Sequence, residues 1–148
     1  MKWIICKMRI LGIIPARGGS KGIPNKNIVD LCGKPLIAWS IKTGLELIEN
    51  NILSRCIVST DNKKIADISE DYGAEVPFFR PAYASTDNAK SIDYVIHALN
   101  EFEKKNQVYD AVMILQPTSP QRNIKAITNS INKFIYSNSN SLISCYKE

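Results

Sequence analysis

Short apolar runs alternate along this chain with longer segments in which apolar residues recur every three or four positions. The short runs predict strands at residues 9–14, 56–59, 75–79, 111–115 and 141–145. The longer segments predict helices at residues 35–48, 62–72, 92–105 and 124–135. Because parallel strands need a crossover between them, this order predicts an α/β fold, a mainly parallel sheet with helices on both faces. We expect residues 1–148 to form one domain that is truncated at its C-terminal end, where the last strand has no closing element.

The composition excludes several classes of protein. With 148 residues, 45% of them apolar and 22% charged, the chain can bury one core without metal or disulfide support. No stretch reaches the roughly 20 apolar residues of a membrane helix, and Lys7, Arg9 and Pro15 interrupt any secretory signal. The four cysteines are widely spaced and form no C-x-x-C pair. We therefore expect a cytoplasmic protein with no membrane partner and reduced cysteines.

The positive charge is concentrated in one region. The net charge is +5, and the first 34 residues hold seven basic residues against one acidic residue. A nucleic-acid-binding protein more often carries a long basic stripe with interleaved aromatic residues. Here the excess surrounds a single glycine-rich loop, which favours a small anionic ligand over nucleic acid.

That loop, residues 15–27 (PARGGSKGIPNKN), directly follows the first predicted strand. Open parallel sheets bind ligands at the carboxyl ends of their strands. Three glycines allow backbone amides to converge on an anion, and three cations, Arg17, Lys21 and Lys26, add charge. The loop matches neither G-x-x-x-x-G-K-[ST] nor G-x-G-x-x-G. It predicts a phosphate site of another kind, with an ordinary solvent-exposed turn as the alternative.

Residues 13–28 (IIPARGGSKGIPNKNI) resemble the opening motif of the cytidylyltransferases that activate sialic acids. Later segments resemble that family in order and spacing: GKPL at 33–36, VSTD at 58–61, RP at 80–81, the stretch 84–91, and LQPTSP at 115–120. The resemblance covers about residues 8–148 and corresponds to the N-terminal portion of the family. It implies a Rossmann-like nucleotidyltransferase fold.

The resemblance also implies a reaction. The family transfers CMP from CTP to the anomeric hydroxyl of a nine-carbon acidic sugar such as N-acetylneuraminate, and releases pyrophosphate in the presence of Mg²⁺. Related enzymes use pseudaminic or legionaminic acid, and full-length relatives form homodimers. A catalytically incomplete fragment that binds CTP without turning it over is the alternative.

Carried over position by position, the resemblance assigns Arg17 and Lys21 as catalytic residues that clamp phosphate. It assigns Gln116 to the acceptor sugar. The nucleotide-binding residues that it implies are Gly18, Gly19, Ser20, Gly22, Lys26, Asn27, Arg80 and Ser91. The metal ligands stay unassigned, because the aspartates that hold the metal in relatives lie in parts of the family that follow.

Three further residues have a structural explanation beside a functional one. Asp61 or Asn62 is expected to cap the helix that follows, which favours a capping role for Asp61 over a metal-binding one. Ser91 is either the cap of its own helix or a nucleotide contact. His97 lies beside an apolar stripe and is expected at the surface or boundary rather than as a catalytic base.

Overall fold

The computed structural model describes residues 8–20, 22–137 and 139–145, and its centre is a parallel sheet of three strands. The strands are β1 (Ile10–Pro15), β4 (Arg55–Ser59) and β5 (Ala111–Ile114), in the order β4-β1-β5. In register, Ile13 of β1 lies opposite Ile57 of β4 and Ile114 of β5. The carboxyl ends of all three strands therefore meet at one edge of the sheet.

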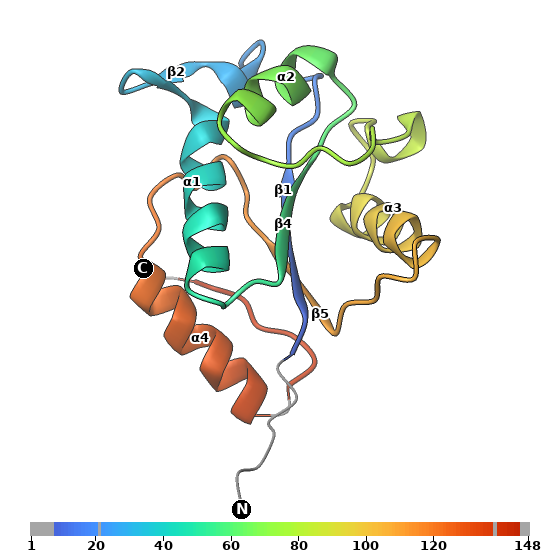
Figure 1. Ribbon diagram of the computed structural model, residues 1–148. Coiled ribbons are helices and arrows are strands. Elements are labelled where there is room, and N and C mark those ends of the chain that lie inside the picture. Colours follow the sequence, from blue (N-terminus) through green and yellow to red (C-terminus); the bar gives the residue numbers. More distant parts are fainter. Residues whose placement is uncertain (1–7, 21, 138, 146–148) are drawn as a thin grey trace, which may run out of the picture.

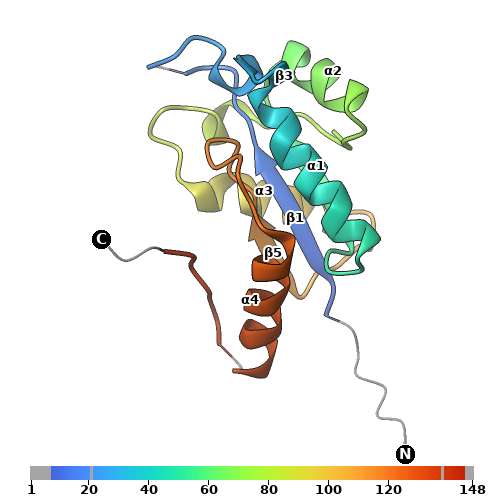
Figure 2. The same cartoon turned by 90° about the vertical axis from the view of Figure 1, so that its left-hand side faces the viewer.

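Helices cover both faces of this sheet, which confirms the predicted α/β fold. α1 (Leu36–Glu49) and α4 (Ile124–Tyr136) lie on one face, and α3 (Ser91–Glu103) lies on the other (Figures 1 and 2). The alternation along β1 explains why both faces are covered: Ile10 and Ile14 pack into the core under α1, while Leu11 and Ile13 pack with α3. α2 (Lys63–Asp71) lies near the carboxyl ends of the strands (Figure 1).

The helix boundaries follow from local hydrogen bonds. Asn62 caps α2, since its side-chain oxygen accepts from the Ile65 amide at 3.1 Å. Asp61 does not cap that helix, so the capping role expected for it is wrong. Ser91 is the first residue inside α3 and Lys90 precedes it as the N-cap residue, so the capping alternative for Ser91 is also wrong. A capping residue must stand outside the helical turn, and Ser91 stands within it.

Two predicted strands do not form. Residues 75–79 meet the sheet only through two isolated bridges, Ile57 with Glu75 and Thr60 with Phe79. Pro77 lies between them and has no amide hydrogen for a continuous ladder, which explains the interruption. Residues 141–145 are exposed and pair with no strand in the described part of the chain. A strand needs a partner, and an apolar run alone does not supply one.

The sequence analysis missed a small hairpin before α1. β2 (Asp30–Leu31) and β3 (Lys34–Pro35) pair antiparallel, and Cys32 and Gly33 turn the chain with φ values of 55° and 80°. Two short 3-10 helices, Lys26–Ile28 and Ala82–Ala84, complete the described elements. Within the described ranges, no helix has the length and apolar character needed to cross a bilayer.

Candidate functional site

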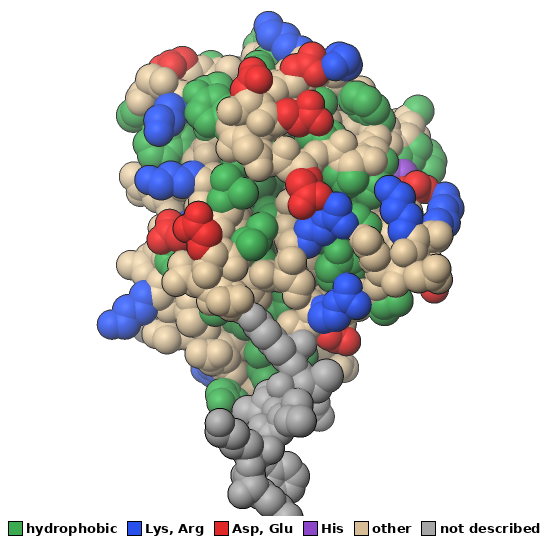
Figure 3. Space-filling model, viewed as in Figure 1, with side chains coloured by type: hydrophobic (Ala, Val, Ile, Leu, Met, Phe, Trp, Pro, Cys, Tyr) green, Lys and Arg blue, Asp and Glu red, His purple; other side chains and the backbone are tan. Residues whose placement is uncertain are grey.

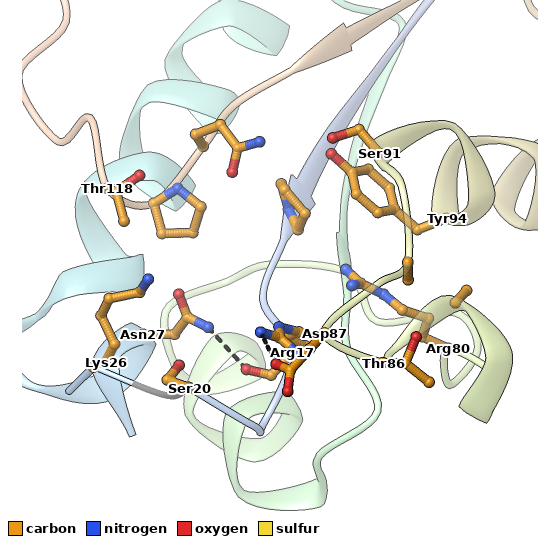
Figure 4. Close-up of a pocket in the computed structure, with 16 residues that line it drawn as sticks. Arg17, Ser20, Lys26, Asn27, Arg80, Thr86, Asp87, Ser91, Tyr94 and Thr118 are labelled. Atoms are coloured by element: carbon orange, nitrogen blue, oxygen red, sulfur yellow. Dashed lines mark hydrogen bonds and ion pairs between the residues drawn. The ribbon is translucent and has the colours of Figure 1, made fainter. Parts of the chain in front are cut away.

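A cavity of about 420 Å³ opens at the carboxyl ends of β1 and β5 (Figure 4). Its volume lies within the range of small-molecule sites. Three separate segments form its walls: the glycine-rich loop after β1, residues 80–94 leading into α3, and residues 116–118 after β5. Of the residues that the sequence assigned to a site, the cavity brings together Arg17, Ser20, Gly22, Lys26, Asn27, Arg80, Ser91 and Gln116.

The loop after β1 is held by hydrogen bonds within the loop and to β4. Asn27 is buried, and its side-chain amide donates to the Arg17 carbonyl at 3.0 Å (Figure 4). The Ala16 amide donates to the Ser59 carbonyl at 2.9 Å and so fixes the start of the loop to β4. Asn27 therefore shapes the loop from inside while it also lines the cavity. Lys21 lies outside the described residues, and its phosphate-binding role stays a prediction.

Gly18 and Gly19 do not line the cavity. The Gly18 amide donates to the Asp61 carboxylate at 2.7 Å, which ties the loop to the end of β4. A Cβ atom at Gly18 would lie 2.7 Å from Nδ2 of Asn62, whereas one at Gly19 would meet nothing within 4 Å. Close approach to the α2 cap thus explains the glycine at position 18. Asp61 holds the loop, a role that the sequence analysis did not foresee.

Arg17 is engaged by a carboxylate inside the cavity. Its Nη2 atom lies 2.6 Å from Oδ1 of Asp87, and Nη1 donates to the Ser85 carbonyl at 3.3 Å. The two side chains of the ion pair are 30% and 39% exposed. Asp87 is the only carboxylate that lines the cavity within the described ranges. The cation assigned to phosphate is therefore neutralised by the protein itself.

Arg80 provides a second, buried cation on the α3 side. Only 6% of the residue is exposed; Nε donates to the Ser59 hydroxyl at 3.0 Å and Nη2 to the Ser59 carbonyl at 2.6 Å. Its guanidinium lies 4.6 Å from the ring centre of Tyr94. Burial lowers the pKa of Arg80 from its ordinary value, while Asp61 and Tyr94 act in the opposite direction. A guanidinium still remains protonated in proteins, so the cavity wall keeps this charge.

Gln116 reaches the cavity from the end of β5. Its backbone carbonyl accepts hydrogen bonds from Nη2 of Arg122 and, at 3.5 Å, from the Ser40 hydroxyl. Arg122 also donates from Nη1 to that hydroxyl at 2.9 Å, and burial lowers the pKa of Arg122. These bonds fix the backbone after β5 against α1, and they leave the Gln116 side chain free to face the cavity.

The chain is similar to known proteins over most of its length. The sequence profile of the cytidylyltransferase family matches residues 11–145. The chain belongs to the cytidylyltransferase family. It is 44% identical over 124 residues to the CMP-N,N'-diacetyllegionaminic acid synthase of Legionella pneumophila, and 42% identical over 132 residues to a pseudaminic acid cytidylyltransferase of Campylobacter jejuni. An N-acylneuraminate cytidylyltransferase of Escherichia coli is 38% identical over 125 residues.

These alignments cover 84%, 89% and 84% of this cytidylyltransferase chain, but only 52%, 56% and 28% of the respective relatives. The chain therefore spans about half the length of the first two. A solved structure of a CMP:2-keto-3-deoxy-manno-octonic acid synthetase complexed with CTP superposes with a TM-score of 0.73. The identity is 19%, and the match covers 88% of this chain and 49% of that one. This likeness confirms the nucleotidyltransferase-type fold.

The implied Mg²⁺ ion finds no matching set of ligands among the described residues. Magnesium prefers carboxylate oxygens together with substrate phosphates. The described residues contain no group of three or more histidine, cysteine or acidic side chains able to hold a metal. Asp87 lines the cavity but pairs with Arg17, and Asp61 accepts from Gly18. The described residues therefore do not fit a carboxylate-bound magnesium site.

The face shown in Figure 3 carries no continuous basic stripe, because acidic and basic side chains intermix on it.

His97 does not line the cavity. Its ring and that of Phe78 pack edge to face, with ring centroids 5.1 Å apart. Burial lowers the pKa of His97 from its ordinary value. This position agrees with the boundary histidine expected from the sequence.

Sequence reasoning missed several residues of the cavity. They are Thr86, Asp87, Tyr94 and Thr118. Two signals could have found them. Thr86 and Asp87 lie within the stretch 84–91 that resembles the family, and Tyr94 stands three positions after Ser91, on the same face of a helix.

Proposed function

We propose that this cytidylyltransferase chain binds CTP in the cavity and supports transfer of CMP to a nine-carbon acidic sugar of the legionaminic or pseudaminic type. The observation that carries the proposal is the convergence of Arg17, Arg80 and Gln116 on one cavity. They come from three segments far apart in the sequence. The relatives at 44% and 42% identity are named for legionaminic and pseudaminic acid, which favours these sugars over N-acetylneuraminate as the acceptor.

The proposed reaction needs positioning and charge more than covalent chemistry from the protein. The anomeric hydroxyl oxygen bonds to the α-phosphorus of CTP as the bond from that phosphorus to the β-phosphate oxygen breaks. Pyrophosphate leaves, and the hydroxyl loses its proton. Negative charge on the phosphoryl oxygens would be stabilised by Arg17 and, from the sequence, Lys21. Ser20, Gly22, Lys26 and Asn27 would surround the phosphates, and Arg80 and Ser91 would hold the nucleoside.

Calorimetric titration of CTP into the chain tests the binding half of the proposal. We expect Arg17→Ala to weaken CTP binding at least tenfold, because a cation in contact with the phosphates is lost. Arg9→Ala is the matched control: Arg9 directly precedes β1 at the opposite end of the strand and faces the Tyr109 ring. Equal CTP affinity in the wild type and Arg17→Ala would contradict the proposal.

Pyrophosphate release from CTP tests the second half, with legionaminate, pseudaminate and N-acetylneuraminate as alternative acceptors and Mg²⁺ present. Release with either of the first two above that with N-acetylneuraminate supports the proposed acceptor class. Preference for N-acetylneuraminate refutes that choice of sugar. CTP binding with no pyrophosphate release from any acceptor would support the alternative function, a CTP-binding module without turnover. The described residues contain no carboxylate set for a metal, which is the observation that favours this alternative.

A further inference from the structure

The hydroxyl of Tyr94 is a buried polar group with no hydrogen-bond partner in the described part of the chain. Tyr94 is 6% exposed and lines the cavity from the first turn of α3. A buried hydroxyl left unpaired is unfavourable, because it has lost its hydrogen bonds to water and gained none in the protein. Proteins usually satisfy such groups, so an unpaired hydroxyl at a ligand cavity points to a partner that the ligand brings.

The surroundings of Tyr94 hold its ring in place. The Arg80 guanidinium packs over one face of the ring at 4.6 Å, and Arg80 is itself fixed by two hydrogen bonds to Ser59. Figure 4 shows the ring reaching from α3 toward the cavity. A tyrosine with a clamped ring presents its hydroxyl at a defined point, which is what selective recognition requires.

Two exposed side chains share the cavity with Tyr94. Ser91 and Gln116 also line the cavity and are exposed, and neither side chain makes a hydrogen bond to the described residues. Rotation of exposed side chains is fast and costs little. A ligand that enters the cavity can therefore move these two side chains, and Tyr94 lines the same cavity.

The position of the hydroxyl selects one part of a nucleotide. In Figure 4, Tyr94 and Ser91 lie on the α3 side of the cavity, across from Lys26 and Ser20 of the loop. The loop cations attract phosphate, whereas the neutral Tyr94 hydroxyl, which can both donate and accept, suits neutral polar groups on the opposite side of the cavity. The nucleoside part of a pyrimidine nucleotide offers such groups on its base and ribose.

We propose that Tyr94 is a specificity-determining residue whose hydroxyl hydrogen-bonds the nucleoside part of CTP rather than its phosphates. This inference rests on the proposed CTP-binding function. It adds a residue that sequence reasoning did not assign to the side of the cavity where Arg80 and Ser91 are proposed to hold the nucleoside.

The test is Tyr94→Phe, titrated with CTP, CMP and inorganic tripolyphosphate. We expect the affinities for CTP and CMP to fall about three- to tenfold, the loss of one hydrogen bond. Tripolyphosphate affinity should stay unchanged. Tyr83→Phe is the matched control, because Tyr83 is exposed and does not line the cavity.

Thermal unfolding separates this role from a structural one. The hydroxyl has no partner in the protein, so Tyr94→Phe should unfold at the wild-type temperature or slightly above it. Unchanged CTP and CMP affinities would overturn the inference, as would an equal loss of tripolyphosphate affinity or a lowered unfolding temperature. If the wild type binds CTP and only the Tyr94→Phe outcome fails, the proposed function stands; if the wild type binds no CTP, both fail.

Discussion

Asp87→Asn should tighten the binding of CTP. In the free protein the Asp87 carboxylate occupies the position beside Arg17, 2.6 Å from Nη2, that a phosphate oxygen would take. CTP must displace this carboxylate or accept a negative charge close to its phosphates. The substitution removes the charge and keeps a side chain of nearly the same shape, so it isolates the electrostatic competition.

The magnitude follows from distance and exposure. Two unit charges about 5 Å apart repel by about 3 kcal/mol at an effective dielectric constant of 20 and by under about 1 kcal/mol in water. Both side chains are about one-third exposed, which places the effect between these limits, at about 1–2 kcal/mol. That range corresponds to about a 5- to 30-fold tighter dissociation constant.

Titration calorimetry at low and high ionic strength measures this effect. The gain should shrink as salt is added, because screening weakens the repulsion between partly exposed charges. Glu103→Gln is the matched control, since it removes the same charge from an exposed position at the last residue of α3. The unfolding free energy of Asp87→Asn should change by at most about 1 kcal/mol, as expected for an exposed ion pair. Weaker CTP binding would refute the reasoning and would mean that Asp87 orients Arg17 for the ligand.

Three further variants or treatments test other parts of the site. Arg80→Lys loses the two guanidinium hydrogen bonds to Ser59 of β4. The free energy of unfolding, measured in urea, should therefore fall by about 1–3 kcal/mol. An unchanged unfolding midpoint would contradict the buried position of Arg80. Gly18→Ala should destabilise the chain by about 1–3 kcal/mol because its methyl group meets the α2 cap at 2.7 Å, while Gly19→Ala, with nothing within 4 Å, should not. Burial raises the pKa of Cys56 to about 12, so its thiol stays protonated at pH 8. A disulfide reagent at that pH should label the exposed Cys32 and leave Cys56 unmodified until the chain unfolds. Equal labelling of the two cysteines would refute the buried position of Cys56.

The local parts of this structure could be predicted from the sequence. Apolar periodicity located β1, β4, β5 and all four α-helices, because burial on one face of each element imposes that period. The same signal failed at residues 75–79, where Pro77 interrupts pairing, and at residues 141–145, where no partner strand is present in the described part of the chain. Whether an apolar run becomes a strand depends on a neighbour that the run itself does not specify.

The candidate site shows the same difference between features that are local in the sequence and features that depend on long-range contacts. The loop after β1 was found because its glycines and cations are adjacent in the sequence. Asp87 and Tyr94 were missed, since their roles depend on contacts with Arg17, 70 residues away, and with Arg80 on a different element. Such pairings arise only when the carboxyl ends of β1 and β4 are brought together, so residue type and spacing could point to these residues but not to their partners.

The loop backbone and its leading cation, Arg17, are both held by contacts within the protein, but these contacts have opposite consequences for CTP binding. Asn27 holds the loop backbone, and Asp61 holds the Gly18 amide. These bonds spare an incoming nucleotide the cost of ordering the loop, which favours affinity. The pairing of Arg17 with Asp87 acts against affinity, because that cation must exchange one anion for another. Asp61→Ala and Asp87→Asn should therefore change CTP affinity in opposite directions although both remove one negative charge, since the first removes the acceptor of the Gly18 amide and loosens the loop, whereas the second frees the cation. A charge effect alone would move both the same way.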